Sequence, residues 1–485
     1  MHTRSLGLFL SLLIAATPAL ASEAATDARI RQVENDLLPR AALKKDLGRP
    51  STLAQRMQQL GIPGVSIAVI DGGKVVWTRA YGIADTVDKT PVTVDTIFQA
   101  GSISKPIAAL GALRLVKEGK LSLDEDVNAK LQTWRVPAND FTKEQKVTLR
   151  RLVSHTAGLT VHGFPGYAVD SKIPTVVQVL DGQPPANTSA VRVDVIPGST
   201  YRYSGGGYTV MQLLIADVAK ESFESFMQSK VLDVLGMTSS SYSQSPPAAL
   251  AARRASAHRP GGQRIPGKFH IYPEMAAAGL WTTPSDLARY LLYVEAAVRG
   301  ETGQLLTPAL AKDLVTRQQP GEHGLGPSID EPGEFARFGH GGVDEGFEAD
   351  MLAYVSGGRG VVIMANANLA QLLFQEIRGS VARAYQWPGY TIEPQIEAQP
   401  ISQTILERAP GKYQLNPEMI GTLAARDGRL FLEISDFGAF EVFAKSATEL
   451  FAPPLGPVSI QLVESDGKVT ALKTSNGREF KRLDK

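Results

Sequence analysis

The chain of 485 residues contains no cysteine. It therefore forms no disulfide, carries no thiol nucleophile and offers no thiolate ligand to a zinc ion. It also lacks the cysteine that a thioether- or thioester-linked lipid anchor requires. A cysteine-free chain suits export into an oxidising space, where a stray thiol is a hazard.

The chain has no excess charge of either sign. It carries 50 Lys and Arg residues against 49 Asp and Glu residues, a formal net charge of +1. Without residues 1–21 the two counts are equal, at 49 each. This balance gives no sign of nucleic acid or an anionic membrane as a partner.

Long apolar runs are confined to the first 21 residues. A short basic start with His2 and Arg4 precedes an apolar run over residues 6–16, and a small-x-small site ends at Ala21. This pattern predicts a signal peptide over residues 1–21, cleaved after Ala21, and a secreted or periplasmic protein. A membrane anchor is the alternative, but the run is short for a span of roughly 20 residues and Pro18 interrupts it.

The remaining chain divides into two predicted parts joined by a linker. At 43% hydrophobic residues, the chain can bury a sizeable core. Residues 22–387 place β-rich hairpins near both ends and helices between them, with residues 23–60 expected to be mainly helical. The expected fold class is α+β, an antiparallel sheet flanked by helices with a helical insertion. A proline-marked linker over 388–403 precedes a small all-β module over 404–485, a sandwich or a barrel.

A nucleophile and a base stand three residues apart near the start of an apolar helical run. Ser102 and Lys105 form an S-x-x-K pair, and the helix is expected to continue to Gly119. Residues at this spacing share a helix face, so Lys105 can take the Ser102 proton once burial or a nearby cation lowers its pKa. Pro106 is tolerated only if the helix begins near Ser102, where free N–H groups favour an oxyanion.

This motif is weak by itself, because a second S-x-x-K occurs at Ser465–Lys468. The second copy encloses an Asp-Gly turn between two alternating apolar runs, which predicts a hairpin tip. The assignment of Ser102 therefore depends on three further segments. They are residues 151–159 around His155, residues 197–208 around Tyr203, and residues 338–347, which begin with Phe-Gly-His-Gly-Gly.

Together with Ser102 and Lys105, these ordered segments resemble the serine β-lactamase-related superfamily over roughly residues 50–385. That group includes penicillin-binding proteins, class C β-lactamases, D-stereospecific peptidases and family VIII esterases. The resemblance implies a β-lactamase/transpeptidase-like fold and an enzyme that needs no metal or cofactor. The C-terminal module resembles the lipocalin-like β-barrel appended to some of these hydrolases.

The resemblance also implies roles for individual residues. Ser102 matches the acylated nucleophile, Lys105 its partner base, and Tyr203 the tyrosine of the Y-x-N motif, which shuttles a proton. His340, Gly341 and Gly342 match the K-T-G motif on the strand that lines the cleft. The backbone N–H groups of Ser102 and Val343 would form the oxyanion hole. The general base remains open between Lys105 and Tyr203, which should titrate as a coupled pair.

Two departures from the family pattern bear on the substrate. Gly205 stands where Y-x-N has asparagine, so the amide that would bind an acylamido group is missing. His340 replaces the K-T-G lysine, and a histidine is only partly charged near pH 7. Both changes favour an ester, or a D-amino acid amide or peptide, as the small-molecule substrate. The alternative enzymatic function is that of a β-lactamase or a D-Ala-D-Ala carboxypeptidase. The alternative non-enzymatic function is that of a penicillin-binding cell-wall sensor that is acylated without turnover.

Three other patterns in the chain do not predict a catalytic or ligand-binding site. His155 matches a family motif whose role is structural, so a Ser-His-Asp triad is not expected. His155, His162 and His340 lack the close spacing of a zinc site. The glycines at 205–207 fit neither a dinucleotide-binding nor a P-loop pattern. The oligomeric state is left open.

Overall fold

The computed structural model describes residues 18–330, 332–391, 395–416, 419–434, 438–452 and 458–483. Most of the predicted signal peptide lies outside these residues, so its cleavage stays a prediction. The first described element is the helix α1 (Pro18–Asn35). None of the helices in the described part of the chain is both long and apolar enough to cross a bilayer.

A seven-stranded antiparallel sheet forms the centre of the first domain, in the order β11-β12-β13-β14-β2-β3-β4. The predicted hairpins at Asp71–Gly73 and Ser356–Gly360 are confirmed as the β2–β3 and β13–β14 connections. The expected α+β class is also confirmed. The strand bounds are β2 (Gly64–Asp71), β3 (Lys74–Asp85), β4 (Thr90–Pro91), β11 (Ser328–Asp330), β12 (Arg337–Asp344), β13 (Phe347–Tyr354) and β14 (Gly360–Ala365).

Helices cover both faces of this sheet, and the alternation of side chains along β2 explains why. Val65, Ile67 and Val69 pack into one core with α1, α2 (Leu53–Leu60) and α12 (Gln371–Ala384). Ala68 and Ile70 face the opposite core, which holds α10 (Pro284–Val298) and the helical insertion. Because successive strand residues point to opposite faces, a fully buried strand serves both layers.

The expectation that residues 23–60 are mainly helical is wrong for the middle of that segment. Between α1 and α2 the chain forms β1 (Ala41–Leu43), which pairs in parallel with β15 (Ile396–Ala398) in the predicted linker. This pairing joins segments about 350 residues apart in the chain, and no local pattern indicates it.

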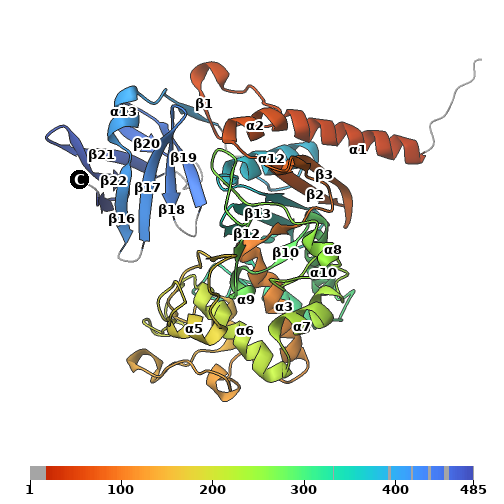
Figure 1. Ribbon diagram of the computed structural model, residues 1–485. Coiled ribbons are helices and arrows are strands. Elements are labelled where there is room, and N and C mark those ends of the chain that lie inside the picture. Colours follow the sequence, from red (N-terminus) through yellow and green to blue (C-terminus); the bar gives the residue numbers. More distant parts are fainter. Residues whose placement is uncertain are drawn as a thin grey trace, which may run out of the picture.

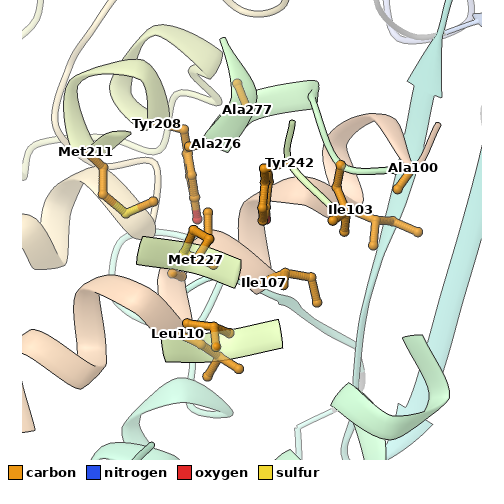
Figure 2. Packing of buried hydrophobic residues seen from close by; sticks show 14 of the residues in the cluster. Ala100, Ile103, Ile107, Leu110, Tyr208, Met211, Met227, Tyr242, Ala276 and Ala277 are labelled. Carbon is orange, nitrogen blue, oxygen red and sulfur yellow. The ribbon is translucent and has the colours of Figure 1, made fainter. Parts of the chain in front are cut away.

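The helical insertion surrounds the helix that follows Ser102. A single 3₁₀ turn, η2 (Gly101–Ile103), leads into α3 (Ser104–Lys117), and α3 packs against α6 (Gly205–Ala219) and α9 (Met275–Ala278). Figure 2 shows Ile103, Ile107 and Leu110 of this segment lying close to Tyr208, Met227 and Tyr242. This packing holds the start of α3 rigidly in the core.

The first domain also contains other short helices and strands. They are η1 (Lys44–Asp46), β5 (Phe98–Gln99), η3 (Val127–Ala129), η4 (Asp140–Thr142), α4 (Leu149–Val153), β6 (Tyr167–Ala168), α5 (Val176–Asp181), α7 (Phe223–Met227), η5 (Gln228–Leu232), α8 (Ala248–Ala251), β7 (His258–Arg259), β8 (Gln263–Arg264), β9 (His270–Ile271), β10 (Trp281–Thr282) and α11 (Pro308–Leu314).

The C-terminal module is an eight-stranded antiparallel barrel that is nearly closed, preceded by α13 (Gln403–Arg408). The Leu483 N–H donates to the Lys412 carbonyl (2.7 Å) and brings the last strand against the first. The second S-x-x-K motif is confirmed as the tip of the β21–β22 hairpin. The strands are β16 (Gly411–Asn416), β17 (Met419–Arg426), β18 (Arg429–Ile434), β19 (Gly438–Ala444), β20 (Glu449–Phe451), β21 (Ser459–Ser465), β22 (Lys468–Thr474) and β23 (Glu479–Lys481).

The barrel contacts the first domain through its outer wall. Leu423, Leu432 and Phe440 form a cross-strand row inside the barrel core. The alternate residues point outward, and Phe431 and Ala439 pack against Leu369 of the first domain. The barrel therefore lies beside the first domain (Figure 1), with its outer wall turned toward it.

Candidate active site

The turn that carries Ser102 is pressed against β12. A Cβ on Gly101 would lie 2.5 Å from Val343 N, and one on Gly342 would lie 1.9 Å from the Ala100 carbonyl oxygen. Gly101 also has a φ of +51°, which favours glycine. This close approach brings the backbone of the Ser102 turn alongside Val343, as an oxyanion hole formed by their two N–H groups requires.

Lys105 lies directly beneath the proposed nucleophile. Its Nζ donates one hydrogen bond to Ser102 Oγ (2.9 Å) and another to the Ala277 carbonyl (2.9 Å), and the residue is only 2% exposed. The Nζ also lies 5.0 Å from the centroid of the Tyr203 ring. The first turn of α3 and the short helix α9 together hold the amine at Ser102, where it can accept or return a proton.

Tyr203 lies between two histidine rings just before α6. The His155 ring stacks on it at 4.1 Å and the His162 ring lies at 4.8 Å on centroid distances. The next residue, Ser204, caps α6 by accepting from the Gly207 N–H, and its own N–H donates to His155 Nδ1 (3.0 Å). His155 thus positions the Tyr203 segment, which agrees with a structural role for it.

Three buried histidines meet behind Tyr203. Ring nitrogens of His155, His323 and His340 all lie within 4.8 Å of one another, so the residue that joins His155 and His340 is His323, which the sequence analysis did not consider. Burial and the nearby Lys105 amine lower the pKa of each ring, that of His323 to about 4. All three rings are therefore neutral at pH 7, and His340 carries no charge to anchor a substrate carboxylate.

The hydrogen bond that His155 accepts does not suit a metal ion, whereas the one that His340 donates leaves a lone pair on its own Nε2. His155 Nδ1 accepts the Ser204 N–H, so the proton of its neutral ring stays on Nε2 and leaves no lone pair there. His340 Nδ1 donates to the Gly341 carbonyl (2.5 Å). The cluster is a buried polar support for Tyr203 and β12.

A cavity of about 490 Å³ contains the Ser102 site. Of the residues predicted from sequence, it is lined by Ser102, Lys105, Tyr203, Gly341, Gly342 and Val343. His340 and Gly205 are not among the lining residues within the described chain. Lining residues to which sequence reasoning gave no role in the site include His162, Phe164, Tyr201, Arg202, Ala277 and Gln371. Tyr201 and Arg202 lie within the predicted 197–208 segment, and the other four lie outside the predicted motifs.

Gly205 lies tight against the 162–164 loop, at the position where the Y-x-N pattern would place an asparagine. A Cβ at this position would lie 3.0 Å from the His162 carbonyl oxygen and 3.0 Å from the Phe164 ring. The loop over residues 162–164 would therefore have to shift by a few tenths of an ångström to admit a side chain there. Phe164 consequently gives the cavity an apolar wall in place of a hydrogen-bonding amide.

The buried carboxyl of Glu274 makes the free energy of unfolding depend on pH. The residue precedes α9, its side chain makes no capping hydrogen bond, and it is fully buried. Burial raises the pKa of its carboxyl to about 8, although the nearby Tyr167 hydroxyl offsets part of this. The unfolded chain loses this proton near pH 4.5. The contribution of this carboxyl to the free energy of unfolding is therefore fully present below about pH 4.5 and is lost as the pH rises through 8.

We expect Glu274→Gln to flatten the pH-dependence of unfolding. Between pH 5 and pH 8 the wild type should lose about 1–4 kcal/mol more unfolding free energy than the variant. Urea titrations at several pH values would measure this, with the exposed Glu221→Gln as the matched control. Parallel curves for wild type and Glu274→Gln would contradict a buried, protonated Glu274.

The sequence of this chain is similar to one protein family and to curated proteins. A profile of the beta-lactamase family matches residues 50–384. Protein flp of Staphylococcus aureus (strain N315) is 26% identical over 329 residues, an alignment that covers 64% of this chain and 61% of that protein. The chain thus spans less than two thirds of the length of these curated relatives.

Two solved structures show the same fold. The octameric penicillin-binding protein homologue from Pyrococcus abyssi is 21% identical, with a TM-score of 0.60, and covers 88% of this chain and 98% of its own. The D-amino acid amidase from Ochrobactrum anthropi SV3, solved with D-phenylalanine, is 21% identical with a TM-score of 0.55. That alignment covers 69% of this chain and 96% of the amidase.

Proposed function

Because this chain belongs to the beta-lactamase family, we propose that it is an exported serine hydrolase that cleaves esters or D-amino acid amides and peptides through an acyl-enzyme on Ser102. The observation that carries the proposal is the contact of Lys105 Nζ with Ser102 Oγ, at 2.9 Å, inside a cavity that also holds Tyr203 and Val343.

The proposed reaction has two halves. Ser102 Oγ gives its proton to an uncharged base and forms a bond to the substrate carbonyl carbon, while the Ser102 and Val343 N–H groups bind the resulting oxyanion. The bond to the leaving group then breaks, and the leaving oxygen or nitrogen takes the proton. Water, deprotonated by the same base, attacks the acyl-enzyme and releases the acid and free Ser102.

The geometry favours Lys105 as the base for the first step. Its amine contacts Ser102 Oγ at 2.9 Å, and the Tyr203 ring lies beside the same amine, with 5.0 Å between Nζ and the ring centroid. A neutral Lys105 can remove the proton directly. Tyr203 is then placed to pass a proton between Lys105 and the leaving group, and the two groups titrate together.

The cavity wall supports the preference for esters and D-amino acid derivatives over β-lactams. The residue at the Y-x-N position has no amide and lies against the apolar Phe164, and buried His340 supplies no positive charge. A substrate is therefore held by apolar contact and backbone hydrogen bonds. The structural likeness to a D-amino acid amidase is consistent with this choice.

We expect Gly205→Asn to fail to create β-lactamase activity. Its Cβ would meet the His162 carbonyl oxygen and the Phe164 ring at 3.0 Å, so the 162–164 loop must shift. Such overpacking typically costs about 1–3 kcal/mol of stability. Nitrocefin hydrolysis and thermal melting of Gly205→Asn would check this, with Gly205→Ala to separate the effect of the Cβ from that of the amide.

A substrate panel tests the proposed function. Wild type and Ser102→Ala would be assayed with p-nitrophenyl acetate and butyrate, D-amino acid p-nitroanilides and nitrocefin. The proposal expects turnover of esters or D-anilides that is absent in Ser102→Ala. Faster hydrolysis of nitrocefin would favour a β-lactamase, and a stable adduct without turnover would indicate a sensor.

Export is tested separately at the N-terminus. The proposal expects the mature protein, recovered from the medium or periplasm, to begin at Ser22, the residue after the predicted cleavage site. A protein that retains Met1 and stays in the cytoplasm would contradict it.

A further inference from the structure

A second cavity, of about 700 Å³, lies between the barrel and the first domain. Its barrel side is formed by residues of β16 to β19, and its other side by residues of the first domain that include Tyr272 and Asn368. Phe164 and Val343 line both this cavity and the one that contains Ser102. The two cavities therefore adjoin at these residues, and the larger side chain at their boundary is that of Phe164.

The backbone before Phe164 is fixed to the start of α6. The Gly205 N–H donates to the His162 carbonyl (2.9 Å), and the Gly206 N–H donates to the Val161 carbonyl (3.0 Å). The Phe164 ring also lies against Gly205, since a Cβ on that glycine would be 3.0 Å from the ring. Because these hydrogen bonds join main-chain groups, they hold the loop without help from the Phe164 side chain.

The backbone after Phe164 is fixed as well. His270 Nδ1 donates to the Pro165 carbonyl (3.0 Å). Gly166 is packed against the Tyr272 ring, because a Cβ on this glycine would lie 2.5 Å from a ring atom. Phe164 itself is only 7% exposed. Since buried, densely packed segments are the least mobile parts of a protein, the Phe164 ring is a fixed partition and not a moving lid.

This partition lies on the acyl side of Ser102. The strand β12 lines the first cavity as far as Val343 and the second cavity from Val343 onward. Tyr203, which would protonate the leaving group, lies toward the earlier end of the strand, with 6.1 Å between its ring centroid and that of His340. The leaving group therefore lies on the His340 side. The acyl group, which stays bound to Ser102, extends the other way, toward Phe164 and the second cavity.

We propose that Phe164 is a specificity-determining residue that closes the acyl side of the Ser102 cavity and restricts the substrate to compact acyl groups, such as a short-chain acid or a single amino acid. The inference rests on the proposed function for the place of the acyl group. The second cavity is the space that a longer acyl chain would need, and the Phe164 ring separates it from Ser102. A packed wall discriminates against added methylene groups, because they must displace atoms that are already in contact.

Esters that differ only in the length of the acyl chain test this directly. We expect wild type to hydrolyse p-nitrophenyl decanoate with a kcat/KM at least about tenfold below that for p-nitrophenyl butyrate, and Phe164→Ala to raise the decanoate-to-butyrate ratio about tenfold. Phe164→Leu removes less volume and should give a smaller rise. Phe141→Ala, at an exposed position, is the matched control and should leave the ratio unchanged. A ratio of two rates does not depend on the folded fraction of a variant.

A second substitution tests where the longer chain goes. Leu423 points into the barrel core, so its neighbour Thr422 points outward, where it lines the second cavity. A tryptophan at this position would fill part of that cavity. Phe164→Ala/Thr422→Trp should therefore return the decanoate-to-butyrate ratio to near its wild-type value. Phe164→Ala/Lys473→Trp, with its tryptophan at an exposed position on β22, should keep the raised ratio of Phe164→Ala.

Three results would overturn the proposal. The first is a wild type that hydrolyses the decanoate and the butyrate equally well. The second is a ratio that neither Phe164→Ala nor Phe164→Leu changes. The third is a raised ratio in Phe164→Ala that survives the addition of Thr422→Trp, because the longer chain would then lie outside the second cavity.

Binding to Ser102→Ala separates this inference from the proposed function, because it needs no turnover. Calorimetry would compare the binding of decanoic acid and butyric acid to Ser102→Ala and to Ser102→Ala/Phe164→Ala. Decanoic acid that binds more tightly to the double variant supports the partition even if no ester is hydrolysed. Ester turnover that requires Ser102, together with equal binding of decanoic acid to both proteins, refutes the partition and leaves the hydrolase intact.

Discussion

Lys105→Met is expected to lower kcat/KM by about 10³–10⁴-fold, the range at the upper end of what general base catalysis supplies. Methionine keeps much of the length and apolar volume of the buried side chain but removes the amine that contacts Ser102 Oγ and the Ala277 carbonyl. Steady-state rates with the best ester of the panel would measure this. Lys117→Met, an exposed lysine at the end of the same helix, is the control.

The size of this effect also decides which group is the base. A loss of less than about tenfold in Lys105→Met would contradict Lys105 and transfer the role to Tyr203. A loss seen equally in Lys117→Met would show that the assay reports on folding. Circular dichroism melting of both variants distinguishes these cases.

Tyr203→Phe is expected to lower kcat by about 10²–10³-fold with little change in stability. The phenylalanine ring can keep the packing between His155 and His162, which lie 4.1 and 4.8 Å from the tyrosine ring, so only the hydroxyl is lost. The larger effect should fall on amides, because an amine leaves only after protonation, whereas p-nitrophenolate leaves unaided.

The control for this prediction is another buried tyrosine. Tyr290 lies on α10 and its hydroxyl makes no hydrogen bond within the described residues, so Tyr290→Phe should keep wild-type rates. The double variant Lys105→Met/Tyr203→Phe should lose much less than the product of the single losses, because residues that act as a unit are not additive. Full additivity would show that the two groups act independently.

The parts of the site that sequence reasoning placed correctly lie within short segments. Ser102 and Lys105 are one helical turn apart, and the structure joins them by a hydrogen bond at the start of α3. Tyr203 and residues 341–343 were found as separate motifs and line the same cavity. The hairpins around Asp71–Gly73 and Ser465–Lys468 follow from local turn chemistry.

The parts it missed depend on contacts between distant segments. Phe164 reaches the cavity because the 162–164 loop fills the space beside Gly205, and no motif marks that loop. His323 joins His155 and His340 from the segment before β11, across about 170 residues of chain. The β1–β15 pair and the barrel wall over the second cavity likewise follow from tertiary packing, which local propensity cannot indicate.

Covalent labelling of Ser102 tests the central claim most directly. The protein would be incubated with a fluorophosphonate and with p-nitrophenyl butyrate, quenched in acid, and examined by intact-mass and peptide mass spectrometry. The account predicts one adduct per chain, on the peptide that contains Ser102, and none in Ser102→Ala. Adducts that persist in Ser102→Ala, or that map to another serine such as Ser465, would contradict it.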